Sequence, residues 1–223
     1  KIWEPSIIMA FLATFITVII ALPVGVLSAT HRNSLLDYFV SSASTVSMTI
    51  PTVCWALLLC YFLAYKLDIF PIMGYTYMAK GSFWKSVYCV LLPSISLGLH
   101  HVASMARLTR STMLDVLNQD YIRTARAKGL AERVVLYKHA LRNALIPIVT
   151  LVGLAIPGVL GGATITETIF SYPGMGRAIF DALVEKDYNV AMAALAFLAL
   201  MTALFNLLAD LAYAVVDPRI RYS

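Results

Sequence analysis

Charge is scarce in this sequence. Only 13% of its residues are Asp, Glu, Lys or Arg, whereas 60% are hydrophobic and the mean hydropathy is +0.80. Soluble domains carry about 25% charged residues, so this composition excludes an ordinary soluble domain and indicates an integral membrane protein. The three cysteines, Cys54, Cys60 and Cys89, lie in apolar segments without the spacing of metal ligands, and we interpret them as packing residues.

Motifs of catalysis and of ion coupling are missing too. No Gly-x-x-x-x-Gly-Lys-Ser/Thr loop is present to cradle nucleotide phosphates. An intramembrane enzyme would need a nucleophile with a base, or a His-Glu-x-x-His metal site, and the sequence has neither. A proton- or sodium-coupled transporter would place carboxylates at mid-depth in its spans, and the apolar runs hold none there. We therefore predict no catalytic residue, no metal site and no cofactor bound by this chain, and an ion-coupled secondary transporter is the alternative function.

Long apolar runs are what the sequence does contain. A helix needs about 20 such residues to cross a bilayer, and helices are expected because lipid offers no partner to backbone polar groups. We therefore predict an all-α, polytopic transmembrane protein in which residues 1–223 form a single domain. The charge-free runs of spanning length are residues 6–30, 38–65, 86–106, 143–166 and 188–209.

Lysine and arginine are unequally divided between the two sides of these five spans. One side collects eleven, which are Arg32, the eight in residues 107–142, Arg219 and Arg221, and the other side collects six. The positive-inside rule places the richer side in the cytoplasm, so the loop 107–142 and the C-terminus are predicted to be cytoplasmic and the first residue to lie outside. Because the chain opens with Lys rather than Met and shows no cleavable signal segment, we expect a sixth span before it.

The loop at residues 107–142 carries the whole net charge. Its eight basic and three acidic residues give +5, and the other nine basic and nine acidic residues cancel. A charged surface of this kind can dock a soluble partner as well as set topology. We expect the third span to run on to about Asn118, Asp120 to cap a short helix over residues 121–128, and Gly129 to end it.

That short helix has only about two turns and would be marginal alone in water, so it needs a packing partner. A second helix is predicted to begin near Ala131 and to lead into the fourth span. Its apolar face is expected to consist of Val134, Tyr137, Leu141, Ala144 and Ile148.

Several longer motifs follow one another along the chain. The loop contains Arg-Leu-Thr-Arg-Ser-Thr-Met-Leu-Asp-Val-Leu at residues 107–117, Tyr-Ile-Arg-Thr-Ala-Arg-Ala-Lys-Gly-Leu at 121–130 and His-Ala-Leu-Arg-Asn-Ala-Leu-Ile-Pro at 139–147. Further on come Glu-Thr-Ile-Phe-Ser-Tyr-Pro-Gly-Met-Gly-Arg at 167–177, Lys-Asp-Tyr at 186–188 and Asp-Pro-Arg-Ile-Arg-Tyr at 217–222. Together they resemble the permeases of ATP-binding cassette (ABC) importers, and more narrowly the first-permease type of their dipeptide, oligopeptide and nickel branch.

This resemblance implies the fold of a type I importer permease in a plasma (inner) membrane, and a coupling helix that sits in a groove of an ATPase and moves with it. It also implies four kinds of partner: a second, homologous permease, two ATPase subunits that hold the ATP, an external solute-binding protein and the lipid bilayer, but no nucleic acid. The implied cargo is a peptide or a related small solute such as glutathione or a nickel complex. The residues implied to couple to the ATPase are Tyr121, Ile122, Arg123, Thr124, Ala125, Arg126, Ala127, Lys128, Gly129 and Leu130.

Candidates for a gate or solute pathway lie after the fourth span begins. Gly158 and Gly162 form a Gly-x-x-x-Gly step, which favours close helix packing and, alternatively, a mobile seam. Residues 167–189 are too polar to span, so we expect a short lateral helix at the outer mouth, or a mere connector. Its turn would use Pro173, Gly174 and Gly176 beside Glu167, and its apolar stripe would use Ile179, Phe180, Leu183 and Val184.

Two adjacent histidines, His100 and His101, lie in the third span. On a helix they point about 100° apart, so they are poor joint metal ligands. We interpret them as packing or interfacial residues, and the alternative is that one of them lines the pathway.

Overall fold

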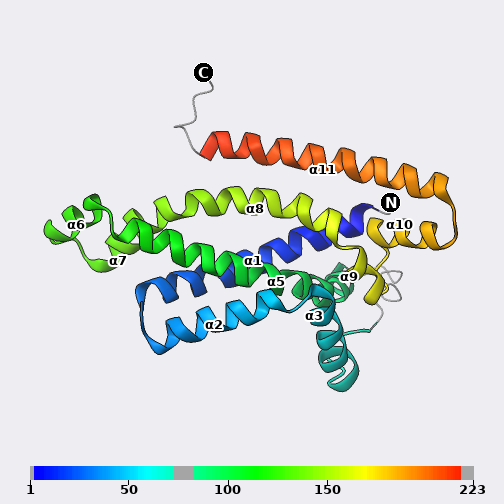
Figure 1. The fold of residues 1–223 in the computed structure, drawn as a ribbon, viewed down its shortest axis with the longest axis horizontal. Coiled ribbons are helices and arrows are strands. Elements are labelled where there is room, and N and C mark those ends of the chain that lie inside the picture. The colour runs from blue at the N-terminus through cyan, green and yellow to red at the C-terminus, as the bar shows by residue number, and fades with distance from the viewer. Residues whose placement is uncertain (1–2, 73–82, 217–223) are drawn as a thin grey trace.

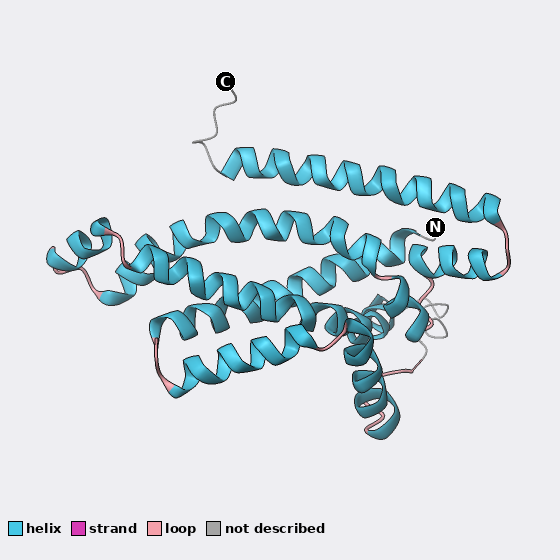
Figure 2. Cartoon of the chain, in the orientation of Figure 1, coloured by secondary structure: helices cyan, strands magenta, loops and turns pink. Residues whose placement is uncertain are grey.

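The computed structural model describes residues 3–72 and 83–216, which leaves the predicted motif at 217–222 outside the described part. The described residues are helical and contain no strand, so the all-α prediction is confirmed (Figure 1 and Figure 2). In chain order the elements are α1 (Trp3–Thr30), α2 (Leu35–Thr49), α3 (Thr52–Leu59), the π-helix η1 (Cys60–Lys66), α5 (Phe83–Leu117), α6 (Asp120–Ala127), α7 (Glu132–Val134), the π-helix η2 (Val135–Leu141), α8 (Arg142–Gly162), α9 (Thr164–Ile169), α10 (Met175–Val184) and α11 (Tyr188–Val216).

Four described helices are long and apolar enough to cross a membrane, and a bent pair raises the number to five. The bent pair corrects the prediction of one continuous span over residues 38–65. Its two halves, α2 and α3 with η1, meet at 101° around Ile50 and Pro51. Proline disfavours the helical conformation of the residue before it, and Ile50 is accordingly extended, with φ −78° and ψ 121°.

The closest pairing in the bundle joins α1 to α5, and small residues make it close. A Cβ atom on Gly25 of α1 would lie 2.5 Å from the Cβ of Thr109, and one on Gly98 of α5 would lie 3.2 Å from the carbonyl oxygen of Ala13. In lipid, helices associate through van der Waals packing of small residues of this kind rather than through the hydrophobic effect. The two helices therefore form the centre of the bundle, against which α2 and α8 also pack.

Helix α2 is fixed to this centre by a buried ion pair that the sequence did not reveal. Asp37, of which 3% is exposed, receives two hydrogen bonds from the Arg110 guanidinium of α5, at 2.6 and 2.7 Å. The Ser28 hydroxyl of α1 donates to the same carboxylate at 2.5 Å, and the Asn33 amide donates at 3.0 Å. One arginine of the charged loop is therefore used inside the fold rather than offered to a partner.

The two ends of the bundle carry different short elements. Helix α6 projects at one end, while α9 and α10 lie at the other, and α11 runs along α8 on the outside (Figure 1). The fourth predicted span stops earlier than expected, because the helix breaks at Ala163 between α8 and α9. These two ends hold the candidate sites that the sequence suggested.

Candidate functional site

The short helix expected in the charged loop is α6. Asp120 is not its cap, as we had predicted, but its first residue, because Gln119 is the extended residue that precedes the helix. Gly129 ends the helix as predicted: its φ is +75°, and its amide donates to the Arg126 carbonyl at 2.9 Å, while the Leu130 amide donates to the Ala125 carbonyl at 3.4 Å. This pair of bonds is the Schellman arrangement, which satisfies the carbonyl groups at the end of a helix.

Alanine at Gly129 should strain this ending without touching anything else. No atom lies within 4 Å of a Cβ built there, so the cost is the left-handed backbone conformation alone, about 1–2 kcal/mol. We expect Gly129→Ala to lower the thermal unfolding midpoint of the purified protein, and Gly129→Asn to lower it less, because asparagine tolerates this conformation. Equal midpoints for the two variants would contradict this explanation.

One face of α6 is buried in the same chain. Ile122 has no exposed surface and Ala125 has 7%, and both belong to a hydrophobic cluster with Val26 of α1, Met113 of α5 and Ala140 of η2. Burial of an isoleucine side chain stabilises by roughly 1.5–3 kcal/mol. This contact is the packing partner that a two-turn helix requires, and with Ala144 of α8 in the same cluster it joins α6 to four other elements.

The other face of α6 is open to solvent. Of the ten residues predicted to couple to an ATPase, Ile122 and Ala125 point into the bundle. The remaining eight are exposed: Tyr121, Arg123, Thr124, Arg126, Ala127, Lys128, Gly129 and Leu130. The structure therefore splits the predicted set into an anchoring face and a basic, accessible face.

Two side-chain contacts tie α6 to the helix that follows it. Arg126 makes an ion pair with Glu132 of α7, at 2.7 and 3.2 Å, and this contact raises the pKa of the Arg126 guanidinium. The Asn143 amide of α8 donates to the Tyr121 hydroxyl at 2.8 Å. Sequence reasoning missed Glu132 and Asn143, because neither is one of the apolar residues that recur at helical spacing in that segment.

A π-helical stretch changes the register of the segment after Gly129. The residues that face the core there are Val135, Ala140, Ala144 and Ile148, each at most 1% exposed. The predicted Val134 and Tyr137 are instead 38% and 62% exposed, and Leu141 is only partly buried. The first step of the buried series is five residues rather than three or four, because η2 follows the wider i→i+5 turn.

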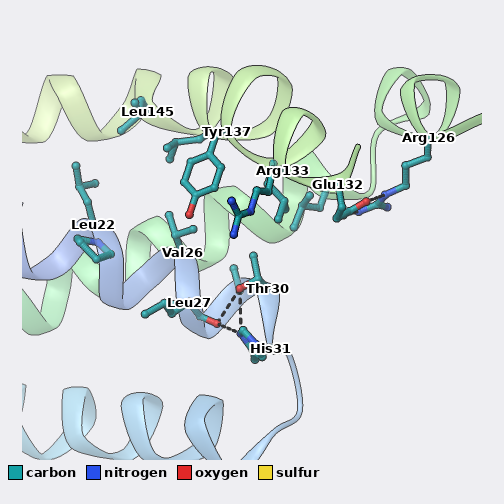
Figure 3. Close-up of a pocket in the computed structure, with 15 residues that line it drawn as sticks. Leu22, Val26, Leu27, Thr30, His31, Arg126, Glu132, Arg133, Tyr137 and Leu145 are labelled. Carbon is teal, nitrogen blue, oxygen red and sulfur yellow. Dashed lines mark hydrogen bonds and ion pairs between the residues drawn. The ribbon is translucent and has the colours of Figure 1, made fainter. Parts of the chain in front are cut away.

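Beside α6 lies a groove of about 750 Å³ between α1 and the α7–η2–α8 segment. Its walls are apolar near Leu22 and Leu145, and the Arg126–Glu132 pair lies at its α6 end (Figure 3). The side chains of Arg133, from α7, and Tyr137, from η2, reach toward α1 in this groove (Figure 3). The α1 and η2 segments are therefore separated by open space beside the cluster that anchors α6.

At the opposite end of the bundle, Glu167 occupies a buried polar site. It is 1% exposed, accepts a hydrogen bond from the Ser6 hydroxyl at 2.6 Å and another from the Arg177 amide at 2.9 Å. The Ser6 hydroxyl in turn accepts the Met175 amide at 2.8 Å. Burial raises the pKa of Glu167, and the hydrogen bonds from Ser6 and from the amides of Arg177 and Gly176 oppose that rise.

This carboxylate caps the first turn of α10, where a negative charge is favoured by the free amides. Gly174 is required beside it, because a Cβ atom there would overlap the Glu167 carboxylate, and a Cβ on Gly176 would lie 2.6 Å from the Cα of Thr164. Three of the predicted gate residues, Glu167, Gly174 and Gly176, thus meet in one place, together with Ser6, which the motifs did not single out.

The other predicted gate residues are not among these contacts. Pro173 lies in the turn before α10, and Gly158 and Gly162 lie in α8. The predicted apolar stripe lies on α10, and only part of it is covered by this chain. Ile179 is buried, together with Met175 and Ala182, whereas Phe180, Leu183 and Val184 are 45%, 48% and 65% exposed.

Comparisons with known proteins agree with these features. Residues 21–222 match the family described as binding-protein-dependent transport system inner membrane component. The chain is 41% identical over 218 residues to the oligopeptide transport system permease protein AppB of Bacillus subtilis (strain 168), an alignment that covers 97% of this chain and 69% of that protein. It is 39% identical over 225 residues to the dipeptide transport system permease protein DppB of Escherichia coli (strain K12), covering 91% of this chain and 66% of that protein.

A solved structure shares the fold. A chain from an inward-facing structure of the MetNI methionine ABC transporter superposes with a TM-score of 0.78 at 18% identity, covering 96% of this chain and 94% of that chain. The helical architecture, the family match and the similarity to peptide permeases lead to one conclusion. The chain belongs to the family of inner-membrane components of binding-protein-dependent transport systems, and it is a multi-pass permease subunit of an ABC importer.

Proposed function

We propose that this permease forms part of the pathway by which peptides, or a related small solute such as glutathione or a nickel complex, enter the cell. The names of its relatives, an oligopeptide and a dipeptide permease at 41% and 39% identity, support the cargo. In this proposal it pairs with a second, homologous permease, two ATPase subunits and an external solute-binding protein. The chain itself is non-catalytic, and the ATP is held by its partners.

The two-faced helix α6 is the observation that carries the coupling role. Its accessible face presents Arg123 and Lys128, and it projects from the end of the bundle (Figure 1). In this proposal the excess of basic residues in the loop at residues 107–142 supports a cytoplasmic location for that loop and for the C-terminus, on the side where the ATPases would be. A rigid, basic projection of this kind suits a groove on a soluble partner.

Movement of the ATPase would reach the membrane through the buried face of α6. Ile122 packs in a cluster that includes residues of α1, α5, η2 and α8. The ties from Arg126 to Glu132 and from Asn143 to Tyr121 add two polar links to the start of the next span. Displacement of α6 by a partner would therefore shift several membrane helices together.

Two alanines on opposite faces of α6 allow a matched test. In a chain whose native cysteines are replaced by serine, Ala127→Cys and Ala125→Cys are each labelled with a photoreactive maleimide in membranes that contain the complete importer. Ala127 is exposed and Ala125 is 7% exposed. We expect a crosslink to the ATPase subunit from Ala127→Cys and none from Ala125→Cys.

A crosslink of equal yield from both positions, or from neither, would contradict the proposed contact. The transport role is tested separately, by ATP-dependent uptake of di- and oligopeptides into vesicles with and without the ATPase subunits. Uptake that persists without the ATPases and follows a proton or sodium gradient would favour the ion-coupled alternative.

A further inference from the structure

Helix α2 carries a stripe of hydroxyl groups along one side. Its members are Tyr38, Ser42, Thr45 and Thr49, and they recur at positions i, i+4, i+7 and i+11, so they share one face of the helix. All four are exposed. A different side of the same helix is apolar and also exposed, with Leu35, Phe39, Ala43 and Val46. Helix α2 therefore has a polar side and an apolar side, and neither is covered by the rest of this chain.

Helix α5 carries a second polar stripe with the same kind of spacing. It consists of Ser96, His100, Ser104, Arg107 and Ser111, at positions i, i+4, i+8, i+11 and i+15. Ser96 is buried, His100 and Ser104 are partly exposed, and Arg107 and Ser111 are exposed. The stripe thus opens progressively toward the end of the bundle that carries α6.

The two stripes meet where the helices pack together. The Arg107 guanidinium donates a hydrogen bond of 2.7 Å to the Thr45 hydroxyl. Arg107 takes part in no ion pair among the described residues, and the neighbouring carboxylate of Asp37 is already engaged by Arg110. Deeper in the bundle, the Ser96 hydroxyl and the Nδ1 atom of His100 are buried without a partner among the described residues.

This arrangement does not suit contact with lipid. An arginine costs about 2.5–3.5 kcal/mol at the centre of a membrane helix and less toward the helix ends, where Arg107 lies, and such residues usually face a bundle interior, a water-filled cavity or the interface. Unpartnered buried hydroxyl and imidazole groups likewise favour water or a polar ligand. The apolar side of α2, by contrast, needs no water.

We propose that these two stripes, which we call the polar strip, line the inner half of the solute pathway, and that Arg107 attracts the carboxylate of the passing solute. The proposal rests on the transport function proposed above and adds a location and a chemical preference to it. A carboxylate fits because Arg107 makes no ion pair among the described residues, and bidentate pairing with a carboxylate is among the strong contacts that a guanidinium makes. Solutes without a carboxylate or another anionic group would gain nothing from it.

Adjacent residues on α2 provide matched positions for an accessibility test. Ser42 and Ala43 lie at the same depth on different sides of the helix, as do Thr45 and Val46. Single cysteines are introduced at each position in the complete importer, with Cys54, Cys60 and Cys89 replaced by serine. Membrane-impermeant methanethiosulfonates are then added to inside-out vesicles. We expect Ser42→Cys and Thr45→Cys to react roughly tenfold faster than Ala43→Cys and Val46→Cys, because only the polar strip is in contact with water.

The charge preference is tested with the same vesicles. At Ser104→Cys the anionic sulfonatoethyl reagent should react several-fold faster than the cationic trimethylammonioethyl reagent, and adding Arg107→Gln should abolish that preference. Slow labelling on both sides of α2 would mean that a partner subunit covers the strip, and would overturn the proposal. So would a charge preference that survives Arg107→Gln. Because labelling needs no solute, a failure of peptide uptake with intact strip labelling would instead count against the proposed cargo.

Discussion

Replacement of Ile122 by alanine will lower solute uptake per ATP hydrolysed by about tenfold or more in vesicles that contain the complete importer. Ile122 is fully buried and anchors α6 in its cluster. Truncation of a buried isoleucine costs about 2–5 kcal/mol, and 1.4 kcal/mol corresponds to a factor of ten. An eight-residue helix has little stability of its own. The ATPases should therefore still bind and hydrolyse ATP, while their motion no longer reaches the membrane helices.

A graded series makes this expectation specific. Ile122→Val removes one methyl group, costs about 0.5–1.5 kcal/mol, and should reduce coupling only partly. Val134→Ala serves as the control, because Val134 lies in the same loop with 38% of its surface exposed. Uptake per ATP that stays at the wild-type value in Ile122→Ala would show that this contact transmits no motion.

Substitution of Gly174 by alanine should destabilise the opposite end of the bundle strongly, and a second substitution should cancel the effect. The added Cβ overlaps the Glu167 carboxylate, and overpacking typically costs 1–3 kcal/mol. Glu167→Ala should also be destabilising, because the Ser6 hydroxyl proton and the Arg177 amide lose their acceptor, at about 1–3 kcal/mol for each group. In the Glu167→Ala background the obstacle is gone, so Gly174→Ala should cost almost nothing more.

Gly176 offers the matched control for this double-mutant cycle. The atoms that a Cβ there would meet belong to Thr164, with its Oγ1 at 2.5 Å and its Cα at 2.6 Å, and not to the carboxylate. Gly176→Ala should therefore cost the same in the wild-type and Glu167→Ala backgrounds. Thermal unfolding midpoints of the purified variants give the comparison, at roughly 2–4 °C for each kcal/mol in a chain of this size. If Gly174→Ala proves equally costly in both backgrounds, the proposed overlap is wrong.

Local signals in the sequence predicted much of the structure of the loop at residues 107–142. Gly129 could be recognised because only glycine adopts the left-handed conformation freely at a helix end, and the structure has it at φ +75°. The length of α6 followed from the same signal. The π-helix η2 could not be foreseen, because Val134 and Val135 both fit an apolar face and only packing decides which is buried. The exposure of Val134 and Tyr137 follows from that choice.

Contacts between distant parts of the chain escaped prediction for a different reason. Ser6 and Glu167 are 161 residues apart, and Asp37 and Arg110 are 73 apart. Nothing in the local pattern around Ser6 distinguishes it from the other small polar residues of an apolar helix, which pack or back-bond within their own helix. Glu167 was selected from the family motif alone, without its partner. The polar sites at both ends of the bundle therefore depend on tertiary structure.

The distance in sequence between Asp37 and Arg110 also has a consequence for how the protein is made. A ribosome adds about 5–20 residues per second, so the 73 residues between the two partners take about 4–15 s to synthesise. During that interval Asp37 has been made but its cation has not. The Ser28 hydroxyl and the Asn33 backbone amide precede Asp37 in the chain, so these two donors to its carboxylate have already been synthesised. The hairpin of α1 and α2 is therefore synthesised before the arginine that pairs with its buried carboxylate, and this ion pair can form only after that part of α5 has been made.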